Sequence, residues 1–213
     1  VGVVAAETIA QAIVRAIESR EKPQRAVTLE DCETLAKETP GVRLARVSAK
    51  ANLHPGFPCF KAPGIITVII LPYLPVDMPM PGRELANTVT AYLTRRRVIG
   101  TRIMVTGPTY RKVAVRAQVQ ACKGIKKNDL QEKIKERLNS FFHPIKGGAD
   151  GKGWPFGRDI YRSEVLQVID ETHGVDHVLF MELITEDGVP QCGNICLGPA
   201  GLVAAGKHQI EVK

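Results

Sequence analysis

Two histidines and two cysteines near the C-terminal end of the chain have the most distinctive metal-ligating chemistry. His173 and His177 precede Cys192 and Cys196, and each pair has three intervening residues. That spacing occurs at structural zinc sites, which use imidazole nitrogens and thiolates as ligands. Against such a site, Gly174 stands at a predicted helix-to-strand junction, and residues four apart along a strand are well separated. We therefore expect buried thiols with incidental histidines, and no bound metal.

A glycine-rich stretch, residues 147–153, invites a phosphate-binding interpretation because glycines let backbone N–H groups surround an anion. A P-loop needs a glycine four intervening residues before Gly-Lys, and Ser or Thr directly after it. Lys146 and Gly153 occupy those two positions, and the stretch follows a predicted helix instead of a strand. We expect an ordered surface loop there.

Catalytic motifs are missing from the sequence. It contains no Gly-x-Ser-x-Gly, no His-Glu-x-x-His and no dinucleotide fingerprint after a strand. The acidic residues are scattered among basic ones at helical positions, which is typical of solvated ion pairs. We predict no enzymatic activity, no catalytic residues and no cofactor.

Two aromatic residues follow the glycine-rich stretch. Trp154, which is the chain's single tryptophan, and Phe156 flank a proline, and Arg158 comes two residues later. Aromatic side chains of this kind either fill the gap between two domains or anchor a partner. The first interpretation is the favoured one.

Positive charge is concentrated in the middle of the chain. The net charge is +7, yet residues 83–137 hold fourteen Lys and Arg against four acids, so this segment carries +10. A concentrated surplus indicates a partner surface, either an acidic protein or nucleic acid. The triplet Arg95, Arg96 and Arg97 closes a predicted helix, where cations also complement the helix dipole. A nucleic-acid-binding α+β module using residues 83–137 is the alternative function, although the predicted strands at 65–71 and 113–121 lack aromatics for base stacking.

Composition and cysteine use narrow the class of protein. The chain has 213 residues, of which 44% are hydrophobic and 24% charged, as in ordinary globular proteins and unlike disordered or collagenous ones. No apolar run approaches the ~20 residues that span a bilayer. Five cysteines and the absence of a secretory signal favour a reducing compartment.

Hydrophobic periodicity predicts the elements that position these residues. Helical spacing is expected at 9–17, 28–39, 85–93, 130–141 and 161–169, and strands at 42–47, 65–71, 103–106, 113–121, 175–183 and 208–212. Thr28 is a plausible N-cap, and the Pro- and Gly-rich residues 52–64 are expected to form a loop.

These elements predict an α+β fold with two small domains. Each has about two helices on one face of a small, mostly antiparallel sheet, ferredoxin-like in outline. We expect residues 1–24 to form a short helix and linker, 25–108 the first α+β domain and 109–213 the second.

Several stretches resemble the baseplate J-like family, the baseplate assembly proteins of contractile phage tails and phage-tail-like injection systems. The most specific is Gly153-Trp154-Pro155-Phe156-Gly157-Arg158-Asp159-Ile160-Tyr161-Arg162-Ser163-Glu164-Val165, preceded by Phe142-His143-Pro144 and Gly147-Gly148. Shorter matches occur at residues 25–31, 40–42, 64–72, 92–101, 201–203 and 206–208. The segment 52–63 and the segment 192–196 match no motif of the family.

The resemblance implies a structural wedge component of a baseplate that acts through protein–protein contacts. Its partners would be copies of itself, other wedge proteins and sheath-proximal or hub proteins, with no membrane, and with nucleic acid the less favoured ligand. Family members are longer, so residues 1–24 would correspond to the end of an upstream core domain. Assembly would take place in the cytoplasm, without a signal peptide, before incorporation into the particle. The interface candidates are Arg95, Arg96, Arg97, Trp154, Phe156 and Arg158.

Overall fold

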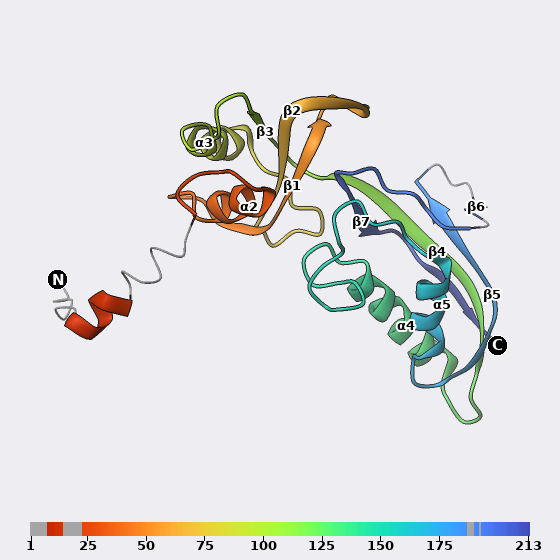
Figure 1. The fold of residues 1–213 in the computed structure, drawn as a ribbon. Coiled ribbons are helices and arrows are strands. Elements are labelled where there is room, and N and C mark those ends of the chain that lie inside the picture. The colour runs from red at the N-terminus through yellow and green to blue at the C-terminus, as the bar shows by residue number, and fades with distance from the viewer. Residues whose placement is uncertain (1–7, 15–22, 187–189, 192) are drawn as a thin grey trace.

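The computed structural model describes residues 8–14, 23–186, 190–191 and 193–213. It has an α+β fold built around two separate sheets, each with its own helices, as Figure 1 shows. The elements up to residue 106 belong to the first sheet's domain, and those from residue 109 belong to the second. The predicted fold class is confirmed.

The first domain has two helices and a three-stranded sheet. Its elements are α2 (Leu29–Lys37), β1 (Leu44–His54), β2 (Phe57–Pro72), α3 (Arg83–Thr94) and β3 (Arg102–Thr106). The strand order is β1-β2-β3, with an antiparallel β1–β2 pair and a parallel β2–β3 pair. The predicted apolar strand lies within β2, where Val68, Ile69, Ile70 and Leu71 are fully buried.

A capping box begins α2, as the position of Thr28 predicts. The Thr28 hydroxyl accepts a hydrogen bond from the backbone N–H of Asp31 at 3.1 Å, and the Asp31 carboxylate accepts one from the Thr28 N–H at 2.8 Å. Both bonds satisfy donors that the first helical turn leaves unpaired. The bond from the Thr28 N–H to the carboxylate is the largest cause that lowers the pKa of Asp31, since it favours the charged form of that group. The helix is therefore fixed at its start by local chemistry.

The structure corrects the predicted loop at residues 52–64, which instead forms the end of a β-hairpin. β1 continues to His54 and β2 starts at Phe57. The pairing jumps from Ala51 opposite Ile66 to Leu53 opposite Lys61. Such an irregularity accommodates extra residues in one strand. Prolines are tolerated in the outer part of β2, because β3 pairs only with residues 65–69 and leaves that part without a second neighbouring strand.

The second domain has two helices and a five-stranded sheet. Its elements are β4 (Thr109–Ala121), α4 (Lys127–Phe141), α5 (Arg162–Asp170), β5 (Val175–Thr185), β6 (Pro190–Gln191), β7 (Gly201–Ala205) and β8 (Gln209–Val212). The strand order is β6-β5-β4-β7, and β8 also pairs with β4. β4 is antiparallel to β5 but parallel to β7 and β8, so this sheet is mixed like the first. No sequence pattern predicted β6 or β7.

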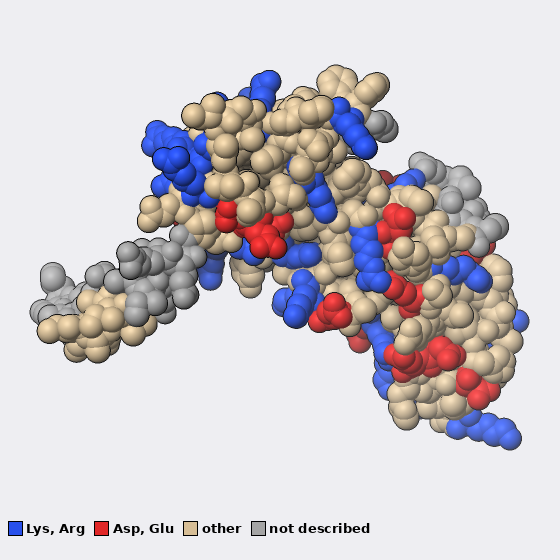
Figure 2. Space-filling model, viewed as in Figure 1, with Lys and Arg blue, Asp and Glu red and all other residues tan. Residues whose placement is uncertain are grey.

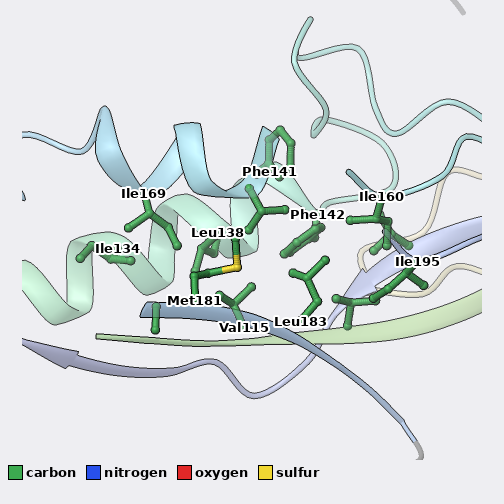
Figure 3. Close-up of a cluster of buried hydrophobic side chains, with 14 of the residues drawn as sticks. Val115, Ile134, Leu138, Phe141, Phe142, Ile160, Ile169, Met181, Leu183 and Ile195 are labelled. Atoms are coloured by element: carbon green, nitrogen blue, oxygen red, sulfur yellow. The ribbon is translucent and has the colours of Figure 1, made fainter. Parts of the chain in front are cut away.

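A continuous hydrophobic core joins α4 and α5 to one face of the second sheet. The predicted apolar stripe of α4 is buried against strand residues such as Val115. The stripe comprises Leu130, Ile134, Leu138 and Phe141. Figure 3 shows Ile134 and Leu138 of α4 near Ile169 of α5 and Met181 of β5. The alternation along β4 therefore places its apolar residues toward the helices and its polar ones on the opposite face.

The N-terminal helix is described in part. Residues 9–14 are helical, whereas the remainder of the predicted helix and linker, residues 1–7 and 15–22, lies outside the described residues. Within the described part of the chain, no helix has the length and apolar character needed to cross a membrane.

Candidate functional site

A charged side chain of the first domain reaches into the second. Arg46 on β1 donates hydrogen bonds from Nη1 to the carbonyl oxygens of Pro144 and Trp154, both at 2.6 Å. Its guanidinium carbon lies 4.9 Å from the centre of the Phe156 ring. Bonds from a charged donor to buried carbonyls are among the stronger hydrogen bonds in proteins. Arg46 therefore fixes the aromatic segment of the second domain against β1.

Tyr110, at the start of β4, adds to the contact between the domains. Its hydroxyl donates to the carbonyl oxygen of Pro79 at 3.0 Å. Burial raises the pKa of Tyr110 far above its ordinary value, and burial lowers the pKa of Arg46. Leu71 of β2 packs in the hydrophobic core of the second domain. Apolar and polar contacts together join the two sheets at this place.

The glycine-rich stretch is ordered by its own backbone. The N–H groups of Gly147, Gly148 and Gly153 donate to the carbonyl oxygens of His143, Phe141 and Gly147, respectively, all at 2.8 Å. Amides that are already bonded within the chain are not directed at an anion. Their internal pairing supports the interpretation as an ordered loop.

Gly153 has no room for a side chain. Its φ is +91°, and a Cβ atom there would lie 2.6 Å from Arg46 Nη1 and 2.6 Å from the Pro144 carbonyl oxygen. Only glycine fits this combination of left-handed backbone and close approach. The loop and the Arg46 contact therefore depend on the same residue.

The aromatic interface candidates lie at this junction. Trp154 is fully buried in the core of the second domain, and its Nε1 donates to the Arg158 carbonyl oxygen at 2.9 Å. Phe156 is half-buried and faces Arg46 of the first domain. Arg158 bonds to Glu164, and its guanidinium carbon lies 5.8 Å from the centre of the Trp154 ring. That any of the three contacts another subunit stays a prediction.

The arginine triplet lies at the opposite side of the first domain, where α3 ends. Arg95 and Arg97 are exposed, while Arg96 stacks its guanidinium carbon 3.7 Å from the centre of the Tyr92 ring. Figure 2 shows Lys and Arg side chains gathered over this end of the first domain. Their role at an interface also stays a prediction.

The rest of the basic segment is dispersed. Its residues lie on α3, β3, β4 and α4, across both domains, and several are paired with acids. Arg116 pairs with Glu182 at 2.6 Å, and Arg137 pairs with Glu171 at 3.3 Å. Figure 2 accordingly shows basic and acidic side chains intermingled over the second domain. The described part of the segment therefore spreads its basic residues over both domains instead of gathering them on one element.

The structure holds two of the zinc candidates, His177 and Cys196, far apart, and Cys196 is exposed, whereas a buried thiol was expected. His177 on β5 pairs with Gln120 of β4, whereas the carbonyl oxygen of Cys196 accepts a hydrogen bond from Arg111. Arg111 and Gln120 both lie on β4, and at about 3.3 Å per residue the strand separates them by roughly 30 Å. Cys192 lies outside the described residues, and the described part of the chain holds no group of three metal-ligating side chains.

A buried histidine, His208, joins the end of the chain to the centre of the second sheet. Its Nδ1 accepts a hydrogen bond from the Val115 N–H at 3.1 Å. Its ring stacks on the Phe142 ring, with 5.8 Å between the two ring centres. Burial, with a smaller effect of Lys135, lowers the pKa of His208 to about 4. Like Arg46, this residue was not among the candidates from the sequence, because neither lies in a motif with recognisable chemistry.

Comparison with known proteins shows similarity to solved structures. No family model matches the chain, and no curated protein does. Among solved structures, the chain is similar to a chain in the cryo-EM structure of the anti-feeding prophage baseplate, 6-fold symmetrised. The TM-score is 0.67 at 16% sequence identity, over 97% of this chain and 43% of that one. The two proteins share a fold, and the present chain spans less than half the length of its structural relative.

Proposed function

We propose that this chain is a structural component of the baseplate of a phage-tail-like particle. The observation that carries the proposal is the shared fold, which extends over 97% of the chain and includes both domains. Two sheets that match in one alignment indicate a preserved arrangement of domains, beyond the similarity of one small module. The motifs that resemble the baseplate J-like family support the same assignment.

The proposed role is that of a wedge protein that acts through contacts with other proteins and not through catalysis. The junction around Arg46 supports this role, because its two short hydrogen bonds hold the domains in one arrangement. A ring subunit needs rigid domains that present several faces to its neighbours. Its proposed partners are copies of itself, other wedge proteins, and sheath-proximal or hub proteins, and its proposed location is the cytoplasm during assembly and then the particle.

Electron microscopy of particles from the producing cells tests this proposal. The chain would carry a C-terminal peptide tag and be labelled with gold-conjugated antibody after particle purification. We expect the label at one end of the tail, and tails without a baseplate when the gene is deleted. Label distributed along the sheath, or normal tails in the deletion strain, would contradict the proposal.

Self-association needs a separate measurement. Two differently tagged copies would be expressed together, and one tag would be used to purify the assembled particles. Recovery of the second tag in the same particles, after removal of free chains, is the expected result. Particles that contain one tag only would exclude the proposed contact between copies.

A further inference from the structure

The turn between α3 and β3 presents an isoleucine entirely to solvent. Ile99 is 99% exposed, at the second position of a tight turn over residues 98–101. The Thr101 N–H donates to the Val98 carbonyl oxygen at 3.2 Å, and the Thr101 hydroxyl donates to the same oxygen at 2.7 Å. Gly100, with φ +87°, supplies the left-handed residue that such a turn requires. The isoleucine therefore lies on a defined turn.

Contacts behind the turn hold it in place. The Ala26 N–H donates to the Arg96 carbonyl oxygen at 2.9 Å, and Ala26 forms a parallel bridge with Arg97. Arg97 Nη1 donates to the Thr101 carbonyl oxygen at 2.9 Å. A surface that is ordered before binding loses less conformational entropy when a partner docks.

Two more exposed aliphatic residues follow the bridge that joins the two segments. Val27 comes directly after Ala26, and Val98 comes directly after Arg97. Val27 is 65% exposed and Val98 is 39% exposed. Val27, Val98 and Ile99, together with the exposed Arg95 and Arg97, are called the α3 corner below.

The cations of the α3 corner are available to a partner. Among the described residues, no ion pair joins Arg95 or Arg97 to a carboxylate, whereas Lys112, Arg116, Arg137 and Arg158 are all paired. Guanidinium groups that no described carboxylate neutralises, next to an aliphatic tip, complement an apolar depression edged by carboxylates. Opposite charge at the edge of an interface accelerates and orients docking, while the buried apolar anchor contributes most of the affinity.

The chemistry of the corner favours a protein partner. Single-stranded nucleic acid is held by exposed aromatic rings, but the exposed apolar residues here are aliphatic, and Arg96 occupies a face of the nearby Tyr92 ring. Stable attachment to a membrane requires a larger buried apolar area or a lipid anchor.

We propose that the α3 corner docks on a neighbouring protein subunit and inserts Ile99 into an apolar depression edged by Asp and Glu side chains. This surface goes beyond the proposed baseplate function and does not depend on it, because it is argued from exposure, charge and order in this chain alone.

Site-specific photocrosslinking in intact producing cells tests the inference. Benzoylphenylalanine replaces Ile99, and the adducts are identified by mass spectrometry. We expect a protein adduct on a peptide that carries Asp or Glu next to apolar residues. An adduct with nucleic acid, with lipid, with residues 1–22 of the same chain, or with a peptide rich in Lys and Arg overturns the proposal, as does the absence of any adduct. Because the readout does not require particles, it separates a failure of this inference from a failure of the baseplate assignment.

Variants of the full chain provide the matched comparison. Ile99→Asp and the pair Arg95→Glu with Arg97→Glu should each lower recovery of the cross-linked partner at least tenfold, using chemical crosslinking of otherwise unmodified chains. Phe60→Asp introduces the same charge at another apolar residue, which is 73% exposed on β2, and should leave recovery within twofold of the parent chain. Circular dichroism should show all three variants folded, because the altered side chains are exposed. Parent-like recovery with Ile99→Asp, or an equal loss with Phe60→Asp, overturns the proposal.

Discussion

Arg46 and Trp154 are joined by a hydrogen bond of 2.6 Å from the guanidinium of one domain to the backbone carbonyl of the other. The bond spans 108 residues of sequence, and the same nitrogen also bonds to Pro144, 98 residues away from Arg46. Both acceptors belong to buried residues. The stability of the junction between the domains therefore depends on the side chain of Arg46.

Replacing Arg46 should destabilise the junction. Arg46→Ala leaves two buried carbonyl oxygens without a partner, which we expect to cost about 3 kcal/mol in the free energy of unfolding. Urea denaturation measures this loss, and the two domains should then unfold in separate transitions. Arg43→Ala is the control, because Arg43 is exposed and its guanidinium carbon lies 5.4 Å from the Tyr73 ring centre, a contact expected to contribute less than about 1 kcal/mol. Equal effects of the two substitutions would contradict the proposed role of Arg46.

A methyl group at Gly153 should displace Arg46. Gly153→Ala places an atom 2.6 Å from the guanidinium nitrogen and adds the strain of a positive φ. Gly124 has a comparable φ of +88° with nothing within 4 Å of the added atom, so Gly124→Ala isolates the backbone strain. We expect about 1–2 kcal/mol of destabilisation at Gly124 and at least twice that at Gly153, measured by urea denaturation. Similar losses at both glycines would show that the crowding at Gly153 is relieved at little cost.

The buried tryptophan should report on folding. Trp154 is the only tryptophan of the chain and is fully buried, so its fluorescence should shift to longer wavelength on unfolding. Trp154→Phe removes the bond to the Arg158 carbonyl and leaves a void, which we expect to destabilise the chain by about 2–3 kcal/mol, measured by circular dichroism in urea. Tyr161→Phe, at a residue that is 40% exposed, should change stability by less than about 0.5 kcal/mol.

His208 should make the stability of the second domain depend on pH. Its folded-state pKa of about 4 lies below the ordinary value of 6.5, so the unfolded chain binds the proton more tightly between those pH values. Stability from the neutral ring is therefore complete above pH 6.5 and is lost as pH falls toward 4. Lowering the pH from 7 to 5 should remove about 2 kcal/mol through this residue.

Comparison with His208→Asn isolates that effect from the carboxylates, which also titrate in acid. The asparagine side-chain oxygen can accept the bond from the Val115 N–H without becoming protonated. The loss of unfolding free energy between pH 7 and pH 5, measured in urea, should be about 2 kcal/mol smaller in the variant. An identical pH dependence in the parent chain and the variant would refute the assignment.

Local patterns predicted the elements, while the contacts between them required the structure. The helical stripe of α4 and the N-cap at Thr28 follow from spacings of three and four residues, and both predictions are confirmed. The hairpin at 52–64 was missed because its prolines and glycines are typical of loops unless the neighbouring strands are known. Arg46 lies in an ordinary strand sequence, so its partners, about a hundred residues away, leave no local pattern.

The candidate site likewise has residues that the sequence predicted and residues that only the structure shows. The sequence directed attention to Trp154 and Phe156, which lie at the junction, through their position after a glycine-rich stretch. It also directed attention to the arginine triplet but not to Ile99, since an aliphatic residue in a turn is unremarkable until its exposure is known. Exposure and order, which are properties of the folded chain, separate Ile99 from the many other aliphatic residues.

The pairing of β4 with both β7 and β8 has a consequence for synthesis of the protein. β4 begins at Thr109, but two of its neighbouring strands, β7 and β8, lie at residues 201–205 and 209–212. Closing loops of that length is slow, and the pairing requires that residues 201–212 have emerged from the ribosome. The first domain can therefore fold earlier in translation than the second sheet. A chaperone that binds the nascent chain would therefore find β4 as its exposed target.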